Sequence, residues 1–413
     1  MKCDRFTNVQ DPWSVAKIGA TFGALLLMSA CGHSQTTQVR TIEEPNVQVG
    51  AERTAEYMPL LVGQRVAVVT NQTGRIGPIH LVDSLLALKV NVVKVFGPEH
   101  GFRGEASDGE KVDNEVDART GLPLISLYGA NKKLSTEQIK DVDVLVFDIQ
   151  DVGVRFYTYI STLHYIMETA AQERKKVIVL DRPNPNGFYV DGPVLDPAFS
   201  SFVGMHPIPL VHGMTIGELA TMVNGEGWLK NGIVCDLTVI PCVGYTHDTM
   251  YSLPIRPSPN LPNDAAIQLY PSLGLFEGTI VSVGRGTDFP FQCIGYPGCT
   301  IGEFQFTPRA MPSSKSPPHK DRTCTGFDLR DYGKVQARLD RRIELVWLLE
   351  LYAQAKDKTT FFNSYFEKLA GTAELRKQVV EGDDEATIRA SWEPGLTAFL
   401  KIRTKYLLYP DFK

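Results

Sequence analysis

The sequence has no apolar run of the length that an ordinary membrane-spanning helix requires. The stretch IGATFGALLLM, residues 18–28, contains about eleven residues, whereas a spanning helix needs about 20. An excess of positive charge is also missing, because the 413 residues carry a formal net charge of −5. No basic stripe with interleaved aromatic residues is present, so the composition disfavours a nucleic-acid partner.

Signature motifs of several common enzyme classes are absent as well. No GxGxxG follows the first predicted strand, which argues against a dinucleotide cofactor, and no GxSxG marks a serine hydrolase. The spacings HExxH, His-x-His and CxxC are also missing. The sequence therefore predicts neither a metal site nor a bound cofactor.

Cysteine is scarce, which limits the number of disulfide bridges that the chain can form. Five cysteines follow residue 31, and because this number is odd, at least one of them is unpaired within a chain. We expect most of them to be buried thiols that pack as small hydrophobes, although a Cys293–Cys299 bridge is left open for an oxidising compartment. The five are Cys235, Cys242, Cys293, Cys299 and Cys324.

The N-terminal region has the features of an export signal. Lys17 precedes the short apolar run, and the small residues of SACG follow it, which indicates a signal peptide over residues 1–30. Cys31 resembles the lipidated cysteine of a bacterial lipoprotein, and the polar residues 31–50 resemble a tether. We expect a periplasmic or envelope lipoprotein, on the outer rather than the inner membrane, with plain secretion and a cytoplasmic location as alternatives.

The segment from residue 51 to 235 alternates between apolar runs and helical patterns. Continuous apolar strands separated by helices are typical of a parallel sheet covered on both faces. The pattern predicts an α/β domain with a Rossmann-like, doubly wound, mostly parallel sheet. Its strands are expected within 65–73, 91–101, 123–129, 141–151 and 177–187, and its helices within 80–90, 157–176 and 214–229.

The alternation of apolar strands and helices ends at about residue 236. One further strand is predicted at 235–242, followed by a proline-rich span at 253–263 and a surface loop at 309–322. Leucine and phenylalanine periodicity predicts helices within 341–355, 361–371 and 396–410. We therefore expect a second, smaller α+β domain over residues 236–413 that completes a cleft with the first.

Polar residues follow four of the predicted strands at the point where each strand ends. In an open parallel sheet, ligands bind beyond the carboxyl ends of the strands. These residues are therefore expected to meet at one edge, although loops are polar in any case. They are Asn71, Gln72 and Thr73; Glu99 and His100; Asp148, Gln150 and Asp151; and Asp181, Arg182, Asn184 and Asn186.

The stretch VFGPEHGFRGE, residues 95–105, crowds titratable groups among three glycines just after a buried strand. A carboxyl group beside phenylalanine side chains loses hydration, which raises its pKa and suits a proton donor near neutral pH. Glu99 is the predicted donor, with His100 beside it. The alternatives are a cap or an ion pair with Arg103 for Glu99, and an ordinary turn residue for His100.

Seven longer motifs occur in a fixed order along the chain and closely resemble the exo-β-N-acetylmuramidase family, long known only as a conserved bacterial domain of unknown function. The resemblance covers about residues 55–410. It implies an exported glycosidase that removes N-acetylmuramic acid from the non-reducing end of peptidoglycan fragments, on a Rossmann-like domain joined to a smaller one. The motifs are FGPEHGFRGE, TGLPLISLYG, DVLVFDIQDVGVRFYTY, LDRPNPNG, GPVLDPAFSSFVG, PLVHGMTIGELA and VGRGTDFPF.

The resemblance also assigns roles to residues within these motifs. Glu99 would be the catalytic acid, and Tyr157 and Asp148 candidates for the second catalytic group. An arginine fork suits the lactyl carboxylate of muramic acid, for which Arg103, Arg155 and Arg285 are candidates. Each of these side chains has a structural alternative in the core or in an ion pair. The substrate-binding set comprises His100, Arg103, Gln150, Asp151, Arg155, Asn184, His212, Arg285 and Asp288.

The mechanism implied is hydrolysis through an oxocarbenium-like transition state, with the second group left open among Asp148, Asp151, Tyr157 and the acetamido oxygen of the substrate. Two other functions remain. One is a metal-dependent hydrolase of the periplasm that would use carboxylates and imidazoles, namely Glu99, His100, Asp148, Asp151 and His212. The other is a lipoprotein that binds muropeptides without catalysis.

Overall fold

The computed structural model of the chain describes residues 47–98, 101–102, 115–127, 129 and 132–413. The predicted signal peptide, Cys31 and most of the tether lie outside these residues, as do Glu99, His100 and Arg103. No helix within the described ranges has the length and apolarity to cross a membrane.

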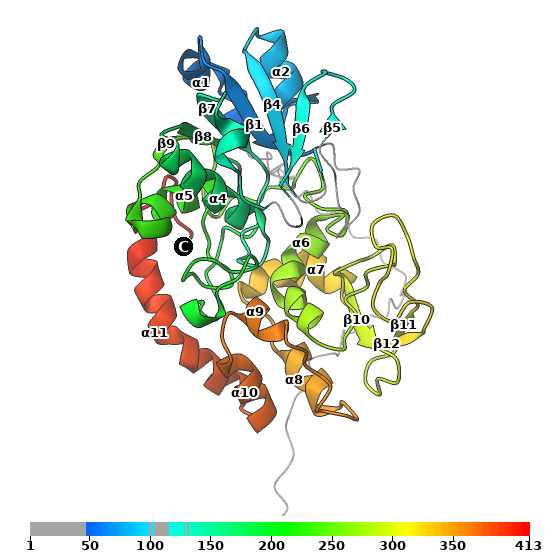
Figure 1. The fold of residues 1–413 in the computed structure, drawn as a ribbon. Helices are drawn as coiled ribbons and strands as arrows, with labels where there is room; N and C mark the ends of the chain where they lie inside the picture. Colours follow the sequence, from blue (N-terminus) through cyan, green and yellow to red (C-terminus); the bar gives the residue numbers. More distant parts are fainter. Residues whose placement is uncertain (1–46, 99–100, 103–114, 128, 130–131) are drawn as a thin grey trace, which may run out of the picture. The chain divides into compact units, whose positions relative to one another are not determined.

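A seven-stranded sheet forms the centre of the N-terminal half (Figure 1). Six strands run parallel, and β5 pairs antiparallel with β6 at one edge. The doubly wound, mostly parallel sheet predicted from the apolar runs is confirmed. In spatial order the strands are β5 (Glu115–Val116), β6 (Pro123–Ser126), β4 (Val92–Gly97), β1 (Val66–Thr70), β7 (Val144–Asp148), β8 (Lys176–Leu180) and β9 (Asp236–Ile240).

Both faces of this sheet are buried, which explains why its strands read as continuous apolar runs. Along β1, Val66 and Val68 pack into one core, while Ala67 and Val69 pack into the other. The first core takes in side chains of α1 (Thr54–Leu61) and α2 (Leu81–Ala87), and the second takes in those of α4 (Tyr159–Gln172) and α5 (Ile216–Gly225).

The start of α5 follows the capping pattern that its sequence predicts. The Thr215 hydroxyl accepts the Glu218 amide at 3.2 Å, and the Glu218 carboxylate accepts the Thr215 amide at 2.9 Å. Each side chain thereby satisfies an amide that the first helical turn leaves without a partner.

The C-terminal half contains a small antiparallel sheet, in the order β10 (Cys293–Tyr296), β12 (Cys324–Asp328) and β11 (Phe304–Phe306), and a set of helices. A hairpin, β2 (Arg75–Ile76) and β3 (Ile79–His80), and short helices such as α3 (Thr136–Ile139) complete the elements. The helices are α6 (Asp264–Leu273), α7 (Arg330–Asp340), α8 (Val346–Ala353), α9 (Phe366–Ala370), α10 (Glu374–Glu381) and α11 (Glu385–Arg403). The short 3-10 helices are η1 (Gly50–Glu52), η2 (Pro197–Phe199), η3 (Lys230–Gly232) and η4 (Gly274–Gly278).

Two boundaries differ from those predicted. The strand expected at 235–242 exists as β9, but it pairs with β8, so the main sheet continues past the predicted domain boundary at 235/236. The helix expected at 396–410 ends at Arg403. Beyond it, the buried Tyr409 side chain and the Leu408 backbone amide make tertiary contacts, while the Leu408 side chain is exposed.

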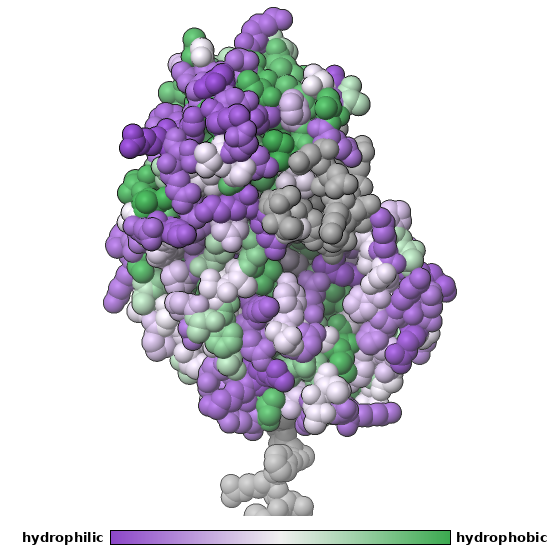
Figure 2. All heavy atoms as spheres, viewed as in Figure 1, coloured by the Kyte–Doolittle hydropathy of each residue, from purple (hydrophilic) through white to green (hydrophobic). Residues whose placement is uncertain are grey.

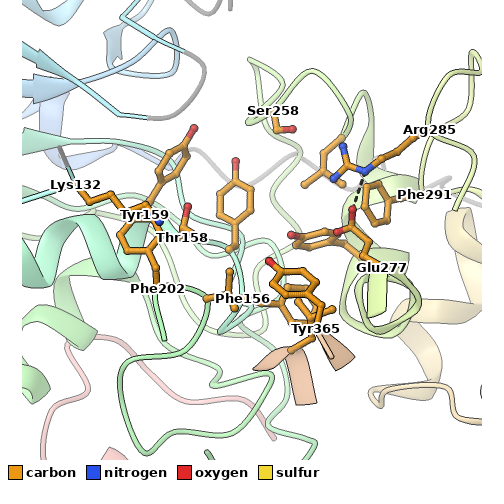
Figure 3. Close-up of a pocket in the computed structure, with 15 residues that line it drawn as sticks. Lys132, Phe156, Thr158, Tyr159, Phe202, Ser258, Glu277, Arg285, Phe291 and Tyr365 are labelled. Carbon is orange, nitrogen blue, oxygen red and sulfur yellow. Dashed lines mark hydrogen bonds and ion pairs between the residues drawn. The ribbon is translucent and has the colours of Figure 1, made fainter. Parts of the chain in front are cut away.

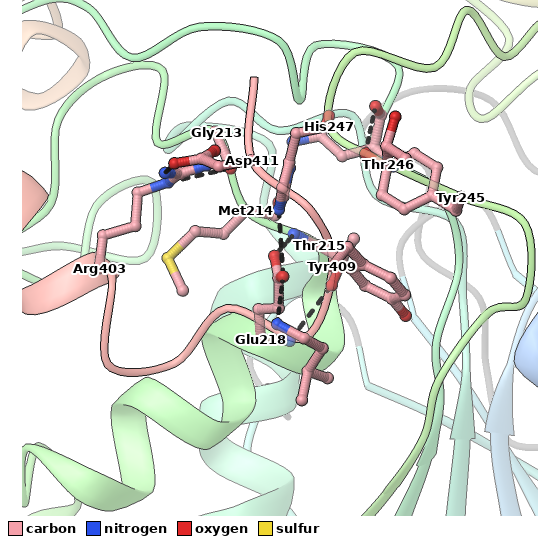
Figure 4. A network of polar contacts seen from close by, with 12 residues as sticks. Gly213, Met214, Thr215, Glu218, Tyr245, Thr246, His247, Arg403, Tyr409 and Asp411 are labelled. Atoms are coloured by element: carbon pink, nitrogen blue, oxygen red, sulfur yellow. Dashed lines mark hydrogen bonds and ion pairs between the residues drawn. The ribbon is translucent and has the colours of Figure 1, made fainter. Parts of the chain in front are cut away.

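These contacts attach the C-terminal segment to the end of β8 and to the start of α5, and Figure 4 shows the part at α5. The Tyr409 hydroxyl donates to Asp181 at 2.5 Å and accepts the Cys242 amide at 2.8 Å. The Leu408 amide donates to Glu218 at 2.8 Å. Each of these bonds joins the end of the chain to a residue of the N-terminal half, so the two halves share one buried polar network.

A second anchor lies beside this network, where the Arg403 guanidinium pairs with Asp411 and donates to the Gly213 carbonyl oxygen (Figure 4). Because this guanidinium is fully buried, both partners help to offset the cost of removing its charge from water.

All five described cysteines are buried free thiols, so the Cys293–Cys299 bridge that the sequence left open is not formed. Exposed large apolar side chains are spread over several elements, for example Val62 near α1, Met250 in a loop, and Val335 and Leu339 on α7. Figure 2 shows a face on which hydrophilic residues predominate and apolar residues are dispersed. Dispersed apolar residues are usual on protein surfaces and indicate no binding site by themselves.

Candidate active site

A cavity of about 320 Å³ brings together side chains from both halves of the chain (Figure 3). Aromatic residues dominate its lining, and three ionisable side chains other than tyrosine interrupt them. The lining residues are Lys132, Phe156, Tyr157, Thr158, Tyr159, Phe202, Val203, Ser258, Leu261, Tyr270, Glu277, Arg285, Phe291, Tyr365 and Leu369.

The cavity lies beside the carboxyl ends of β1 and β7. The segment after β7 carries Tyr157 and Tyr159, and the Tyr159 hydroxyl accepts the side-chain amide of Asn71, which follows β1, at 2.9 Å. From β1 the chain continues to β4 on one side, whereas from β7 it continues to β8 on the other. This reversal is the switch point at which open α/β sheets bind ligands.

Tyr157 is held at the cavity by its hydroxyl group, which donates to the Pro257 carbonyl oxygen at 2.9 Å. Its ring meets those of Tyr159 and Tyr270 edge to face, at centroid distances of 4.9 Å and 6.0 Å. Burial raises the pKa of Tyr157 well above its ordinary value, and the neighbouring tyrosines add to the effect. The site therefore favours the neutral phenol, which donates a hydrogen bond, over a phenolate nucleophile.

Glu277 and Arg285 form an ion pair in the cavity wall, with 2.7 Å between the Glu277 carboxylate and Arg285 Nε. The guanidinium also lies 5.0 Å from the centroid of the Phe291 ring. Sequence reasoning identified Arg285 but missed Glu277, which η4 places at the site. The nearest sequence signal is the acid in LFEGT, only eight residues before the arginine of VGRGTD.

Among the predicted site residues that the structure describes, Tyr157 and Arg285 line the cavity and the others do not. Glu99, His100 and Arg103 lie outside the described residues, so their roles stay predictions. Their neighbour Phe102 is buried, and its ring packs edge-on against His80 at 4.6 Å. Asp288 is exposed at the surface.

Asp148 forms a buried bidentate ion pair with Arg182. Its two carboxylate oxygens accept from Arg182 Nε at 2.6 Å and from the terminal guanidinium nitrogen Nη2 at 3.0 Å. The Asp148 side chain is fully buried, and that of Arg182 is 5% exposed. Both oxygens of Asp148 are thus engaged inside the protein and away from the cavity lining.

Arg155 is also fully buried, and its guanidinium donates to four backbone carbonyl oxygens: those of Pro193, Ile208, Leu369 and Ala370. Burial lowers its pKa to about 9. These bonds connect the segment after β8 to the end of α9. In the described part of the chain, Arg155 therefore joins the two halves and does not face the cavity.

Three further predicted binding residues hold the backbone around the strand ends. Gln150 donates to the carbonyl oxygens of Asp151 and Pro183, and Asn184 donates to that of Met214. His212 is fully buried, and its Nδ1 accepts the Met214 amide at 3.3 Å. Burial lowers the pKa of His212 to about 3, so the ring is neutral at physiological pH.

Asp151 is a buried carboxyl group with one unbonded oxygen. Its Oδ2 accepts the Gly153 amide at 2.7 Å, while Oδ1 has no hydrogen-bond partner among the described residues. Burial raises the pKa of Asp151 to about 7. Because the unfolded value is about 3.9, the folded state retains its proton over a range in which the unfolded state has lost it.

The stabilising effect of this proton is complete below about pH 4 and is lost as the pH rises to about 7. Asp151→Asn keeps the acceptor for Gly153 and removes the titration. We therefore expect the unfolding free energy of this variant, relative to the parent, to rise by about 2–3 kcal/mol between pH 5 and pH 8. Urea denaturation at several pH values measures the difference.

Asp331→Asn is the matched control, because the Asp331 side chain is 98% exposed. Its stability relative to the parent is expected to be the same at both pH values. If the stability of Asp151→Asn relative to the parent were also the same at both pH values, Asp151 would be ionised throughout this range.

No group of three or more His, Cys, Asp or Glu side chains among the described residues is arranged to hold a metal ion. Two of the ligands considered for a metal-dependent hydrolase, Glu99 and His100, are not among those residues. Of the other three, Asp148 is paired with Arg182 and Asp151 accepts a backbone amide.

Known proteins resemble this chain along both of its halves. The family model described as exo-β-N-acetylmuramidase NamZ, N-terminal, matches residues 66–265, and the corresponding C-terminal model matches residues 268–409. Peptidoglycan β-N-acetylmuramidase NamZ of Bacillus subtilis is 38% identical over 422 aligned positions, which cover 94% of this chain and 97% of that protein.

Two crystal structures of DUF1343 family proteins from Bacteroides fragilis have the same fold. One is 48% identical with a TM-score of 0.83, and covers 89% of this chain and 99% of its own. The other is 30% identical with a TM-score of 0.74, and covers 89% and 100%. With both family models matched in order over most of its length, this chain belongs to the exo-β-N-acetylmuramidase NamZ family.

Proposed function

We propose that the chain removes N-acetylmuramic acid from the non-reducing end of peptidoglycan fragments, at the cavity beside β1 and β7. It is a glycoside hydrolase of the peptidoglycan muramidase type, as its family membership and its likeness to the Bacillus enzyme over 94% of the chain support. The observation that carries this conclusion is that both family models match the chain, one after the other.

The size and lining of the cavity suit a single sugar residue. Its volume of about 320 Å³ is at the lower end of the range of about 300–1,000 Å³ for small-molecule sites. Aromatic side chains of the lining, among them Tyr157, Tyr270 and Phe291, would contact the C–H groups of a pyranose, while hydroxyl and charged groups would bind its polar edge. A pocket for one sugar supports exo-acting cleavage over cleavage within a long glycan.

In the mechanism that we propose, Glu99 protonates the leaving glycosidic oxygen as the general acid. Positive charge then develops at the anomeric carbon. Glu277 is the carboxylate of the described lining, and its negative charge would stabilise that oxocarbenium-like state. Tyr157, whose hydroxyl proton is donated to the Pro257 carbonyl oxygen, would accept a hydrogen bond from a sugar hydroxyl group or from the attacking water.

The location of the enzyme is part of the proposal and is supported by the sequence alone. A signal peptide over residues 1–30 would direct export, and lipidation of Cys31 would attach the protein to the envelope. The polar residues that follow would then separate the catalytic body from the membrane surface. This arrangement would keep the enzyme where peptidoglycan fragments are released.

Product analysis on a disaccharide tests the function directly. With N-acetylmuramic acid at the non-reducing end of N-acetylglucosamine, the enzyme should release the two free sugars, as measured by chromatography and mass spectrometry. The disaccharide with the reversed order should remain intact, because its terminal sugar is the wrong one. The rate should be unchanged by EDTA, since none of the proposed steps uses a metal ion.

Cleavage of the reversed disaccharide, or cleavage of a longer glycan at internal bonds only, would contradict the exo-muramidase function. Saccharide binding without any product would instead support a binding lipoprotein. Loss of activity with EDTA and its return with a divalent metal would support the metal-dependent alternative.

A further inference from the structure

Lys132 is a cationic residue in the cavity wall to which no role has been assigned. Its ammonium group lies 4.2 Å from the centroid of the Phe202 ring, which in turn stacks on Tyr165 with an interplanar angle of 14°. Figure 3 shows Lys132, Phe202 and Tyr159 on one side of the cavity, with Glu277 and Arg285 on the other. The aromatic pair therefore fixes the position of a positive charge at the site.

The charges of the lining do not cancel. Apart from tyrosines, its ionisable side chains are Lys132, Arg285 and Glu277. The Arg285 charge is compensated by Glu277 at 2.7 Å. Lys132 has no carboxylate partner among the described residues, and its ammonium group contacts the Phe202 ring. Its neighbour Lys133, by contrast, forms an ion pair with Glu168.

The described lining thus carries one uncompensated positive charge, at Lys132. A partly enclosed, aromatic cavity has a lower effective dielectric constant than water, so this charge attracts an anionic ligand more strongly than an exposed lysine would. It would also disfavour a ligand with a positive charge there.

We propose that Lys132 determines substrate specificity by binding the carboxylate that distinguishes N-acetylmuramic acid from N-acetylglucosamine. The inference rests on the proposed function and adds a named residue to it. The lactyl ether is the acidic group of the terminal sugar, and a flexible lysine can follow its carboxylate as a point charge. Arg285 is already paired with Glu277. Its role is therefore a different one, namely to orient the Glu277 carboxylate beside the reacting carbon.

The test compares a chromogenic N-acetylmuraminide with its lactyl methyl ester, which has nearly the same shape but no charge. The parent enzyme should prefer the acid by roughly 10–100-fold in kcat/KM, as expected for one charge-assisted hydrogen bond. Lys132→Met keeps most of the aliphatic stem and removes the charge that lies over the Phe202 ring. It should lose this preference, mainly through the acid, while turnover of the ester changes little.

Two variants serve as controls. Lys132→Arg retains a cation and should recover part of the preference. Lys140→Met removes the same charge from an exposed side chain that does not line the cavity, and should keep the full preference. A general effect of net charge would instead lower the preference equally in the Lys140 and Lys132 variants.

Binding measurements separate this inference from the proposed function. Calorimetric titration with free N-acetylmuramic acid and with its methyl ester needs no turnover. Should the parent bind both equally, or Lys132→Met keep the preference of the parent, the assignment of Lys132 is overturned. A third outcome is that the parent binds the acid more tightly than the ester, that Lys132→Met loses this preference, and that no substrate is hydrolysed. Lys132 would then recognise the carboxylate, but the hydrolase function would be refuted. Lys132→Gln provides a second neutral variant if the methionine variant does not fold.

Discussion

Replacing Glu99 by glutamine is expected to lower kcat on the natural disaccharide by about 10²–10⁴-fold, the usual contribution of a general acid. Glutamine has the same shape as the protonated acid, but it cannot transfer a proton to the leaving oxygen. The loss should be greatest for a sugar leaving group, which needs protonation. It should be smaller for a nitrophenyl leaving group, which departs readily as an anion. Initial rates on both substrates measure this difference.

The control for this variant is Glu105→Gln, which makes the same change six residues further along the same motif. It is expected to retain activity within a few fold. The Glu99 variant should also lose the alkaline limb of the pH–rate profile, since that limb reports the protonated acid. Equal rates for the parent and Glu99→Gln on both substrates would remove Glu99 from the mechanism.

Replacing Arg182 by methionine is expected to lower the free energy of unfolding by about 3–5 kcal/mol, because it leaves the charge of Asp148 buried without a partner. The Asp148 side chain is fully buried, and both of its oxygens bind Arg182. Urea denaturation, followed by tryptophan fluorescence, measures the change.

The chain offers a matched control in Arg65, which forms a bidentate pair with Asp143 at 2.9 Å and 2.7 Å. These side chains are 45% and 33% exposed. Arg65→Met is therefore expected to cost about 0–1 kcal/mol, since water screens and solvates the charges. Equal losses for the two variants would mean that burial does not set the cost of breaking the pair.

A substitution in the Asp148–Arg182 pair also tests whether Asp148 takes part in catalysis. If its role is structural, Asp148→Asn lowers stability, while kcat of the folded enzyme stays within a few fold of the parent. A loss of 10² or more in kcat at temperatures well below unfolding would return Asp148 to the reaction.

The fold could be predicted because its physical causes are local in the sequence. Strands such as Val66–Thr70 are buried on both faces, so they appear as uninterrupted apolar runs. The cap at Thr215 is likewise a short-range pattern that only needs Glu218 three residues later. The end of α11 could not be predicted, because Leu408 and Tyr409 bond to residues of the N-terminal half.

The cavity was harder to predict for a related reason. Tyr157 and Arg285 lie in motifs that resemble a known family, whereas Glu277 and Lys132 lie in segments without periodicity and are brought to the cavity by tertiary structure. Polar residues at strand ends look alike in a sequence whether they face a ligand or the backbone. Arg155 and Gln150 illustrate the second case, since their side chains bind carbonyl oxygens.

The attachment of the chain end to Asp181, Glu218 and Cys242 limits how this enzyme can be divided or shortened. The two family models meet near residue 266. Asp181 and Glu218 lie in the first of them, but they accept hydrogen bonds from Tyr409 and Leu408. A stop codon just before Tyr409 would therefore leave the Asp181 carboxyl group without one of its donors. During synthesis from the N-terminus, this network would close only after Leu408 and Tyr409 have emerged.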